Sequence, residues 1–329
     1  MRSIISLDTY KEKVYNMVLF SITKGREEFT VHYPGNVNDI LSIIKVVLGE
    51  FGEYFYYNNC SINYMKNGVN ITIKLSKWVR GYNLRKYVDA FSTESQKIIE
   101  SVISSNMNDM QKALALHNYL INNVIYADIQ TVKSNYQKLH TAYGAIVDRY
   151  AVCEGISAAY CHLLRLVGIR ATIVNGSTER SMSYDHCWNI IEIDNAFYHI
   201  DVTWDLKNKN ECNYNNLDYF ALKDVDLNNR IWNKTIYPKC NSDNMNFFYL
   251  SKSIVNSENE LINVAIRQSL KGKSIYLKCL YLKNFQDEQE VCDYIFDLIR
   301  NNKRLSANMR GQLTCSVNLD QLTVYVKCT

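Results

Sequence analysis

The feature that most restricts the fold is a pair of strand-like segments joined by the turn residues Asp194 and Asn195. The segments His186–Ile193 and Ala196–Trp204 are rich in β-branched and aromatic residues. Such segments, separated by two residues that tolerate a left-handed backbone, are typical of a β-hairpin. If the two turn residues alone form the loop, the last residue of the first segment pairs with the first residue of the second.

This register brings two titratable side chains together. It places Trp188 opposite Asp201 and His186 opposite Thr203. Because residues two apart share a face, His186 and Asp201 become diagonal neighbours with Cβ atoms roughly 7 Å apart or less. A four-residue loop keeps this pairing, whereas a three-residue loop would place the two side chains on opposite faces.

Cys153 stands where a loop changes into a predicted helix, Cys153–Val167, which Gly168 ends. A thiol at the start of a helix lies at the positive end of the helix dipole, which favours the thiolate. Gly155 removes side-chain bulk near the sulfur and so would let a substrate approach. Most free cysteines are buried structural residues, so position alone favours a structural Cys153.

The combination of the three residues favours chemistry instead. His186 could hold the Cys153 thiol ionised and later protonate a leaving amine. Asp201 would fix the imidazole tautomer and stabilise its charged form. Each of these features could occur by chance. It is much less probable that a cysteine at a helix start occurs by chance together with a histidine and an aspartate on one face of a hairpin.

Four short segments in this order resemble the bacterial transglutaminase-like family. They are Ala142-Tyr-Gly-Ala-Ile146, Val152-Cys-Glu-Gly155, His186-Cys-Trp-Asn189 and Tyr198-His-Ile-Asp-Val-Thr-Trp-Asp205. The resemblance covers about residues 105–210 and implies a papain-like fold. It assigns the nucleophile to Cys153, the base to His186 and the orienting acid to Asp201. The sequence departs from the family at Ile156, Ser157 and Cys187, beside the site, which weakens any inference about the substrate.

Supporting roles are less defined. The backbone N–H of Cys153 is the expected oxyanion donor. A second donor would come from the preceding loop, where Tyr143, His140 and Tyr150 are candidates and Tyr143 fits the family motif best; a packing role for Tyr143 is the alternative. Trp188 would shield the His–Asp pair from water.

Two further residues compete for places in the site. His199 shares the face of His186 and Asp201, but it lies further along the strand, so we expect a packing or hydrogen-bonding role. Asp205 is a rival for the acid, although Asp201 fits both the hairpin geometry and the motif.

The chain divides into three predicted parts of an α+β protein. A catalytic domain over residues 90–250 is flanked by similar α-β-α-β-β modules over residues 1–85 and 256–329. Short resemblances, such as Cys60-Ser-Ile-Asn63 to Cys315-Ser-Val-Asn318, suggest a duplication, with chance similarity as the alternative. The modules could bind each other, a carrier, a substrate protein or a second copy. Deleting residues 256–329 is expected to preserve the site but weaken substrate use.

Composition excludes several classes. The net charge of +4 comes from scattered cations, so no nucleic-acid partner is expected. No 18-residue apolar run and no apolar leader near Met1 are present, so neither a membrane partner nor secretion is expected, and we predict a cytoplasmic location. The 10 cysteines show no C-x-x-C pair, which fits reduced thiols. No cofactor is implied.

Three functions stay open at this point. The first is an acyl-transfer enzyme that forms a thioester on Cys153. Its donor would be a peptide, a protein or a carrier-bound acyl group. Transfer to water makes it a peptidase or amidase, and transfer to an amine makes it a transglutaminase or an amide-forming biosynthetic acyltransferase. The second is a catalytically silent peptide-binding scaffold, which the intact Cys, His and Asp disfavour.

The third is a metal site. Its ligands would come from Cys153, Cys161, His162, His186 and Cys187. The spacing of these residues matches no structural zinc pattern, and His186 and Cys187 should point to opposite faces of their strand. We therefore predict no metal.

Overall fold

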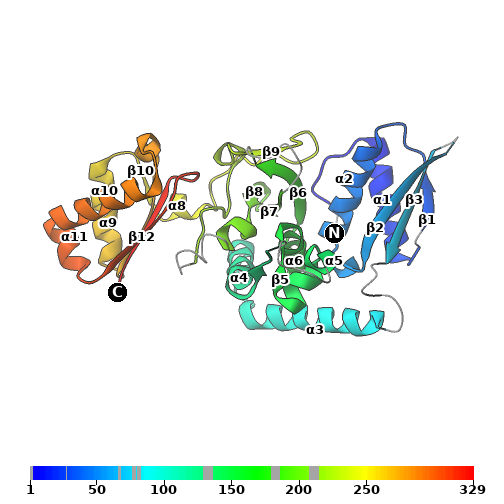
Figure 1. The fold of residues 1–329 in the computed structure, drawn as a ribbon, viewed down its shortest axis with the longest axis horizontal. Helices are drawn as coiled ribbons and strands as arrows, with labels where there is room; N and C mark the ends of the chain where they lie inside the picture. The colour runs from blue at the N-terminus through cyan, green and yellow to red at the C-terminus, as the bar shows by residue number, and fades with distance from the viewer. Residues whose placement is uncertain are drawn as a thin grey trace. The chain divides into compact units, whose positions relative to one another are not determined.

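The computed structural model describes residues 3–26, 28–65, 68–75, 79, 83–128, 136–178, 186–206 and 215–329. Helices and strands are mixed along the chain (Figure 1). The chain forms two compact units: unit 1 holds residues 1–216 and 223–241, and unit 2 holds residues 217–222 and 242–329. The three-part division of the sequence stays a prediction. No helix in the described ranges has the length and apolar character needed to span a membrane.

A four-stranded antiparallel sheet carries the predicted hairpin. Its order is β8-β7-β6-β9, with β6 (Ala171–Thr178), β7 (His186–Ile193), β8 (Ala196–Ile200) and β9 (Arg230–Trp232). Both turn residues have positive φ, 51° at Asp194 and 60° at Asn195, as a two-residue hairpin loop of the favoured twist requires. Ile193 pairs with Ala196, so the predicted register is confirmed.

The second strand of the hairpin is shorter than predicted. The ladder ends at the pair Asn189–Ile200, and residues 202–206 are helical rather than extended to Trp204. Asp201 therefore lies just beyond the ladder. The change of direction lets its side chain cap the start of this helix, where the N–H of Trp204 donates to Asp201 Oδ1 at 3.1 Å.

The helix that begins at Cys153, α6 (Cys153–Leu166), packs on this sheet and on α4 (Asp109–Asn123). Most of α6 is buried. Tyr160 donates its hydroxyl proton to the carbonyl of Ala113 on α4 at 3.0 Å. Asn189 on β7 donates to the carbonyl of Ser157 at 3.0 Å, which fixes the first turns of α6 over the start of β7.

Several smaller elements surround this core. A helix that the sequence analysis did not predict, α3 (Leu84–Val102), packs against α4 (Figure 1). The chain then passes through β4 (Ile125–Tyr126), α5 (Tyr136–Leu139), the π-helical turn η3 (Gly144–Asp148) and β5 (Tyr150–Ala151) before α6, and β4 pairs with β5 in parallel.

The N-terminal module belongs to unit 1. It runs through α1 (Thr9–Thr23), β1 (Glu28–Val31), α2 (Val37–Glu50), the 3-10 turn η1 (Gly52–Tyr54), β2 (Tyr57–Met65) and β3 (Gly68–Leu75), with strand order β1-β3-β2. The predicted β2–β3 turn falls partly on residues 66 and 67, outside the described residues. Both helices lie on one face of the sheet (Figure 1).

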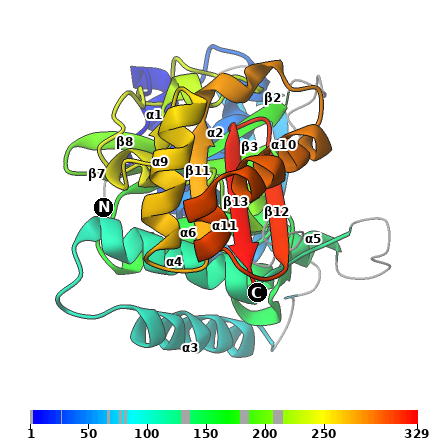
Figure 2. The ribbon, with the colours of Figure 1, turned by 90° about the vertical axis from the view of Figure 1, so that its left-hand side faces the viewer.

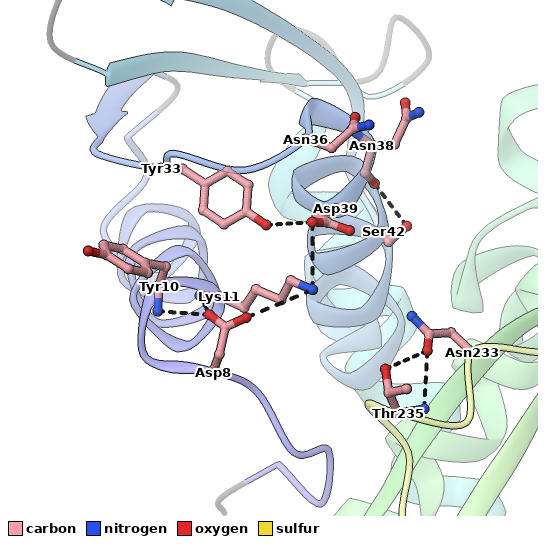
Figure 3. Close-up of polar contacts among 10 residues, drawn as sticks. All are labelled: Asp8, Tyr10, Lys11, Tyr33, Asn36, Asn38, Asp39, Ser42, Asn233 and Thr235. Atoms are coloured by element: carbon pink, nitrogen blue, oxygen red, sulfur yellow. Dashed lines mark hydrogen bonds and ion pairs between the residues drawn. The ribbon is translucent and has the colours of Figure 1, made fainter.

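The two helices are capped and joined by polar contacts at their N-terminal ends. Asp8 caps α1 and Asn36 caps α2. Lys11 lies between two carboxylates, 3.9 Å from Asp8 and 3.6 Å from Asp39. Tyr33 donates to Asp39 at 2.6 Å (Figure 3). These contacts fix the helix pair against the end of β1.

Glycines allow α2 to approach the catalytic core closely. A Cβ on Gly49 would collide with the side chain of Ile173 on β6. A Cβ on Gly52 would lie 2.9 Å from Ala142 Cβ and 3.1 Å from the carbonyl oxygen of Ala158 on α6. The module is therefore packed on the core without a spacer.

Unit 2 contains the C-terminal module. After α8 (Phe247–Leu250) come β10 (Ile254–Val255), α9 (Glu258–Ser269), β11 (Ser274–Cys279), the 3-10 turn η5 (Leu280–Asn284), α10 (Glu288–Asn301), α11 (Lys303–Asn308), β12 (Leu313–Asn318) and β13 (Thr323–Cys328). The strand order is β10-β11-β13-β12. Figure 2 shows α9, α10 and α11 over one face of this sheet, and their apolar sides form one core with it.

Candidate active site

Cys153 is the first residue of α6. The preceding residue, Val152, caps the helix without a side-chain hydrogen bond. No side chain at the cap position therefore competes for the first N–H groups of α6, which point toward the region of the sulfur. We expected Gly155 to give a substrate access to the sulfur, but its missing Cβ would face the preceding loop. A Cβ there would lie 2.8 Å from the carbonyl oxygen of Thr141, so Gly155 lets the preceding loop pass close to the helix.

His186 and Asp201 form the contact that the hairpin predicts. The distance from His186 Nε2 to Asp201 Oδ2 is 2.7 Å, and both side chains are buried. The Nε2 proton is thus directed at the carboxylate. The other ring nitrogen, Nδ1, is left for Cys153, which hydrogen-bonds to His186.

The surroundings of the thiol favour its ionised form. A hydrogen bond from the Cys187 thiol lowers the pKa of Cys153 well below its usual value, against the opposing effect of burial, and the hydrogen bond and charge of His186 lower it further. For His186, burial alone would lower the pKa, but the charge and hydrogen bond of Asp201, together with Cys153, raise it to about 9. Both shifts favour a thiolate at Cys153 beside an imidazolium at His186.

Cys187 is a residue of the site whose role the sequence analysis missed. We expected it to point away from His186, yet Cys153 hydrogen-bonds to both, because His186 and Cys187 are the first two residues of β7. Cys187 Sγ is 3.3 Å from Asn175 Oδ1 on the neighbouring strand β6. The hydrogen bond with Cys153, burial and the negative charge of Cys153 raise the pKa of Cys187, so this second thiol keeps its proton.

Arg230 is a second missed residue. It lies on β9 with its guanidinium buried, 3.4 Å from Asp201 Oδ2 and 4.5 Å from the centre of the Trp204 ring. Burial would raise the pKa of Asp201, but the charge and hydrogen bond of His186, together with the charge of Arg230, lower it. Asp201 is therefore ionised. Arg230 follows Asp201 by 29 residues and lies in no motif, so the sequence offered no signal for it.

Trp188 and His199 form a layer beneath the site. The Trp188 ring is buried and stacks on His186 with ring centres 5.8 Å apart. Its Nε1–H donates to His199 Nδ1 at 3.0 Å. The expected hydrogen-bonding role of His199 is confirmed, and Trp188 covers one face of the His186 ring.

The ligand atoms of His199, Asp224 and Cys240 lie within 4.8 Å of one another, the spacing of a metal site. Their hydrogen bonds satisfy them without an ion. Because Trp188 donates to Nδ1 of His199, the ring proton lies on Nε2, which is directed at Asp224 Oδ1 at 2.9 Å. A metal on Nε2 would have to displace this proton while the Trp188 donor still occupies the other nitrogen.

Asp205, the rival for the acid, belongs to a different pair. Its Oδ2 is 2.9 Å from Nε2 of His117, and both side chains are fully buried. Burial lowers the pKa of His117 to about 4, so His117 is neutral. The pair connects α4 to the short helix after Asp201.

The candidates for the second oxyanion donor lie in different surroundings. Tyr143 packs among aromatic rings, 5.0 Å from Phe55 and 5.5 Å from Tyr87 between ring centres, and burial raises its pKa to about 12. His140 places Nδ1 2.9 Å from the carboxylate of Glu154. These contacts are typical of packing at Tyr143, and its oxyanion role stays a prediction.

Residues 96–202, which include Cys153, His186 and Asp201, match the model of a family described as the transglutaminase-like superfamily. The resemblance predicted from the sequence is confirmed over this segment, and it supports an enzyme that uses a cysteine in acyl transfer or proteolysis.

Two solved structures that match part of the chain are distant from it in sequence. A chain from Cytophaga hutchinsonii, provisionally assigned as a cysteine protease, is 14% identical, with a TM-score of 0.29 over 44% of this chain and 61% of that chain. A structure described as a TGase is 15% identical, with a TM-score of 0.30 over 53% and 49%. The chain thus spans about three fifths of the first and about half of the second. No curated protein matches the chain.

Proposed function

We propose that the protein is a cysteine acyl-transfer enzyme in which Cys153 is the nucleophile, His186 the acid and base, and Asp201 the orienting group. The observation that carries this proposal is the chain of contacts from the thiol at the start of α6 to His186 and on to Asp201, at 2.7 Å from His186. A thiolate next to an imidazolium is poised to attack a carbonyl carbon.

The first half of the reaction forms a thioester. The Cys153 thiolate attacks the carbonyl carbon of the donor, and a C–S bond forms. The oxyanion is stabilised by the backbone N–H of Cys153 and by the positive end of α6. When the intermediate collapses, the bond to the leaving group breaks, and the Nδ1 proton of His186 passes to the leaving amine or thiolate.

The second half uses the same histidine as a base. Once Cys153 is acylated, its negative charge no longer raises the pKa of His186. The neutral ring then removes a proton from the acceptor, which attacks the thioester, and the C–S bond breaks. Water as the acceptor gives a peptidase or amidase. An amine as the acceptor gives a transglutaminase, or an amide-forming acyltransferase where the donor is a carrier-bound thioester.

The test is intact mass spectrometry of the protein after exposure to acyl donors, with peptide amides and acyl thioesters in parallel. We expect an acyl adduct on the wild type and none on Cys153→Ala. Asp201→Asn keeps the thiol but loses the charge that holds the imidazolium, and the adduct should form at least about 100-fold more slowly. An adduct that survives in Cys153→Ala, or no adduct from either donor class, would contradict the proposal.

The pH dependence of the reaction distinguishes attack by the Cys153 thiolate from donation of the His186 proton to the leaving group. The imidazolium of His186, with its pKa raised to about 9, is present below that pH and lost above it. Acylation by an amide donor, which needs the proton for its leaving group, should therefore fall as pH rises through about 9. Alkylation of Cys153 by iodoacetamide needs only the thiolate and should not fall. If both rates rise together up to about pH 9, Cys153 has an ordinary thiol pKa and the ion pair is absent.

A further inference from the structure

A pocket of about 150 Å³ lies between the N-terminal module and the catalytic core. The module contributes α2 and the strands β2 and β3, and the core contributes the start of α6 and β6. We infer that this pocket, given the proposed function, binds one uncharged apolar side chain of a peptide acyl donor, next to the carbonyl that Cys153 attacks.

The pocket lies beside the nucleophile. Glu154, which lines it, follows Cys153 directly in α6. Asn175, another lining residue, is the group that Cys187 Sγ contacts at 3.3 Å. Glu154 and Lys45, which both line the pocket, also act on Cys187: the charge of Glu154 raises its pKa and that of Lys45 lowers it. The pocket is therefore close to the thiols of Cys153 and Cys187. A donor whose carbonyl is at the sulfur can therefore place an adjacent group in the pocket.

The walls of the pocket determine the chemistry of the group. They are mostly aliphatic and aromatic, with Leu41, Ile44 and Leu48 from α2, Tyr57 from β2 and Ile73 from β3. A cavity of about 150 Å³ with such walls holds a group of the size of benzene, which corresponds to the side chain of leucine or phenylalanine. The Glu154 carboxylate is already bound by His140 at 2.9 Å, and exposed Lys45 on the rim opposes a cationic substrate side chain.

The pocket has one side that the family match does not cover. Its module side comes from residues 41–73, outside the segment 96–202 that matches the family. Gly49 and Gly52, which let α2 approach β6 and α6 closely, themselves line the pocket.

The test uses affinity labels that need no turnover. N-acetyl-leucine chloromethyl ketone and N-acetyl-glycine chloromethyl ketone both alkylate a thiolate, with formation of a C–S bond and loss of chloride. Only the first carries a side chain for the pocket. We expect it to label Cys153 at least about tenfold faster than the glycine reagent, as for other apolar pockets. The N-acetyl-lysine reagent should show no such gain.

Matched variants locate the effect. Leu41→Trp adds bulk at a half-exposed position of the rim and should remove most of the gain, and Cys60→Phe, which fills the pocket from β2, should do the same. Leu166→Trp, an equivalent change at the exposed end of α6, should preserve the gain. Equal labelling by the leucine and glycine reagents, or a gain that survives Leu41→Trp, would overturn the inference. The proposed function fails separately, through absence of an acyl adduct while labelling of Cys153 persists.

Discussion

The N-terminal module runs α1-β1-α2-β2-β3 and the C-terminal module runs β10-α9-β11-α10-α11-β12-β13, and the two belong to different compact units. In the N-terminal module the sheet order is β1-β3-β2, and in the C-terminal module the corresponding strands follow the order β11-β13-β12, with β10 added at one edge. The first module is part of unit 1 with Cys153, and the second forms most of unit 2.

A few residues on α2 and just after it account for this difference. Gly49 and Gly52 remove the side chains that would separate α2 from the core. Glu53 then forms ion pairs with Arg165 and, at 3.4 Å, with His162, both on α6. In the C-terminal module, Gly272 has no atom near its missing Cβ.

The C-terminal module instead holds a short segment of the preceding chain. Tyr276 on β11 accepts a hydrogen bond from the N–H of Leu217 at 3.0 Å and donates to Asp218 at 2.7 Å. Asn318 donates to the other oxygen of Asp218 at 2.9 Å. The order of the modules in the sequence therefore does not determine which of them packs on the core. The glycines that permit close packing and the charged Glu53, on α2 and just after it, determine this.

Removing each module in turn has the largest expected effect. Deletion of residues 1–75 uncovers Ile173 and leaves Arg165 without Glu53, so we expect unit 1 not to fold. Deletion of residues 242–329 removes unit 2 except for residues 217–222 and should leave the reactivity of Cys153 toward iodoacetamide within about threefold of wild type. Mass spectrometry after limited alkylation measures both.

The second deletion also has a functional readout. If the C-terminal module supplies contacts for the native donor, labelling of Cys153 by small reagents persists while acylation by large donors declines. Preferential labelling of Cys153 that survives loss of residues 1–75 would mean that the N-terminal module is dispensable for the site, and the comparison would then fail.

A pair of glycine substitutions tests the packing difference directly. Gly52→Val places two methyl groups against the backbone of α6 and should lower the free energy of unfolding of unit 1 by about 3 kcal/mol. Gly272→Val makes the same chemical change where the structure has open space, and its effect should stay within about 0.5 kcal/mol. Denaturant unfolding measures both values. Similar losses in the two variants would show that the glycines act through the backbone and not through packing.

The hairpin explains how much of the site was readable from the sequence. Asp194 and Asn195 accept positive φ at low cost, so a two-residue loop fixed the register from Ile193–Ala196 to Asn189–Ile200. The alternation of side chains then placed His186 near Asp201 by local geometry alone. The end of the strand at Ile200 was not readable, because the residues that follow are as β-branched and aromatic as those before it.

The missed residues share a different cause. Arg230 reaches Asp201 only because β9 pairs with β6, and no local pattern predicts which strand joins that edge. Neighbouring residues of a strand point to opposite faces, so Cys187 was expected to point away from His186. Both residues lie at the start of β7, however, where Cys153 hydrogen-bonds to each of them. Such contacts depend on tertiary packing, which local propensity does not encode.

The smallest expected effect comes from a matched pair of tyrosines, each of which donates to a carboxylate. Tyr15 donates to the buried Glu50 at 2.5 Å in the N-terminal module, and Tyr276 donates to Asp218 in the C-terminal module. Replacing either with Phe leaves a buried acceptor without one partner, so each variant should lose about 1–2 kcal/mol. Hydrogen exchange should place the loss of Tyr15→Phe in α1 and α2, and that of Tyr276→Phe in β11 and β13.

The stability loss of Tyr15→Phe should depend on pH, because Tyr15 donates to Glu50. The loss of Tyr276→Phe does not involve Glu50. Burial raises the pKa of Glu50 above its ordinary value, against the hydrogen bonds from Ser3 and Tyr15. A raised pKa in the folded state means that the stability linked to Glu50 is complete below its unfolded pKa and is lost as pH rises through the folded value. Removing the Tyr15 donor raises that pKa further, so the deficit of Tyr15→Phe should be larger at pH 8 than at pH 5. A deficit that shrinks with pH would mean that Tyr15 stabilises the protonated carboxyl. A deficit that stays constant between pH 5 and pH 8 would mean that Glu50 keeps one protonation state over this range.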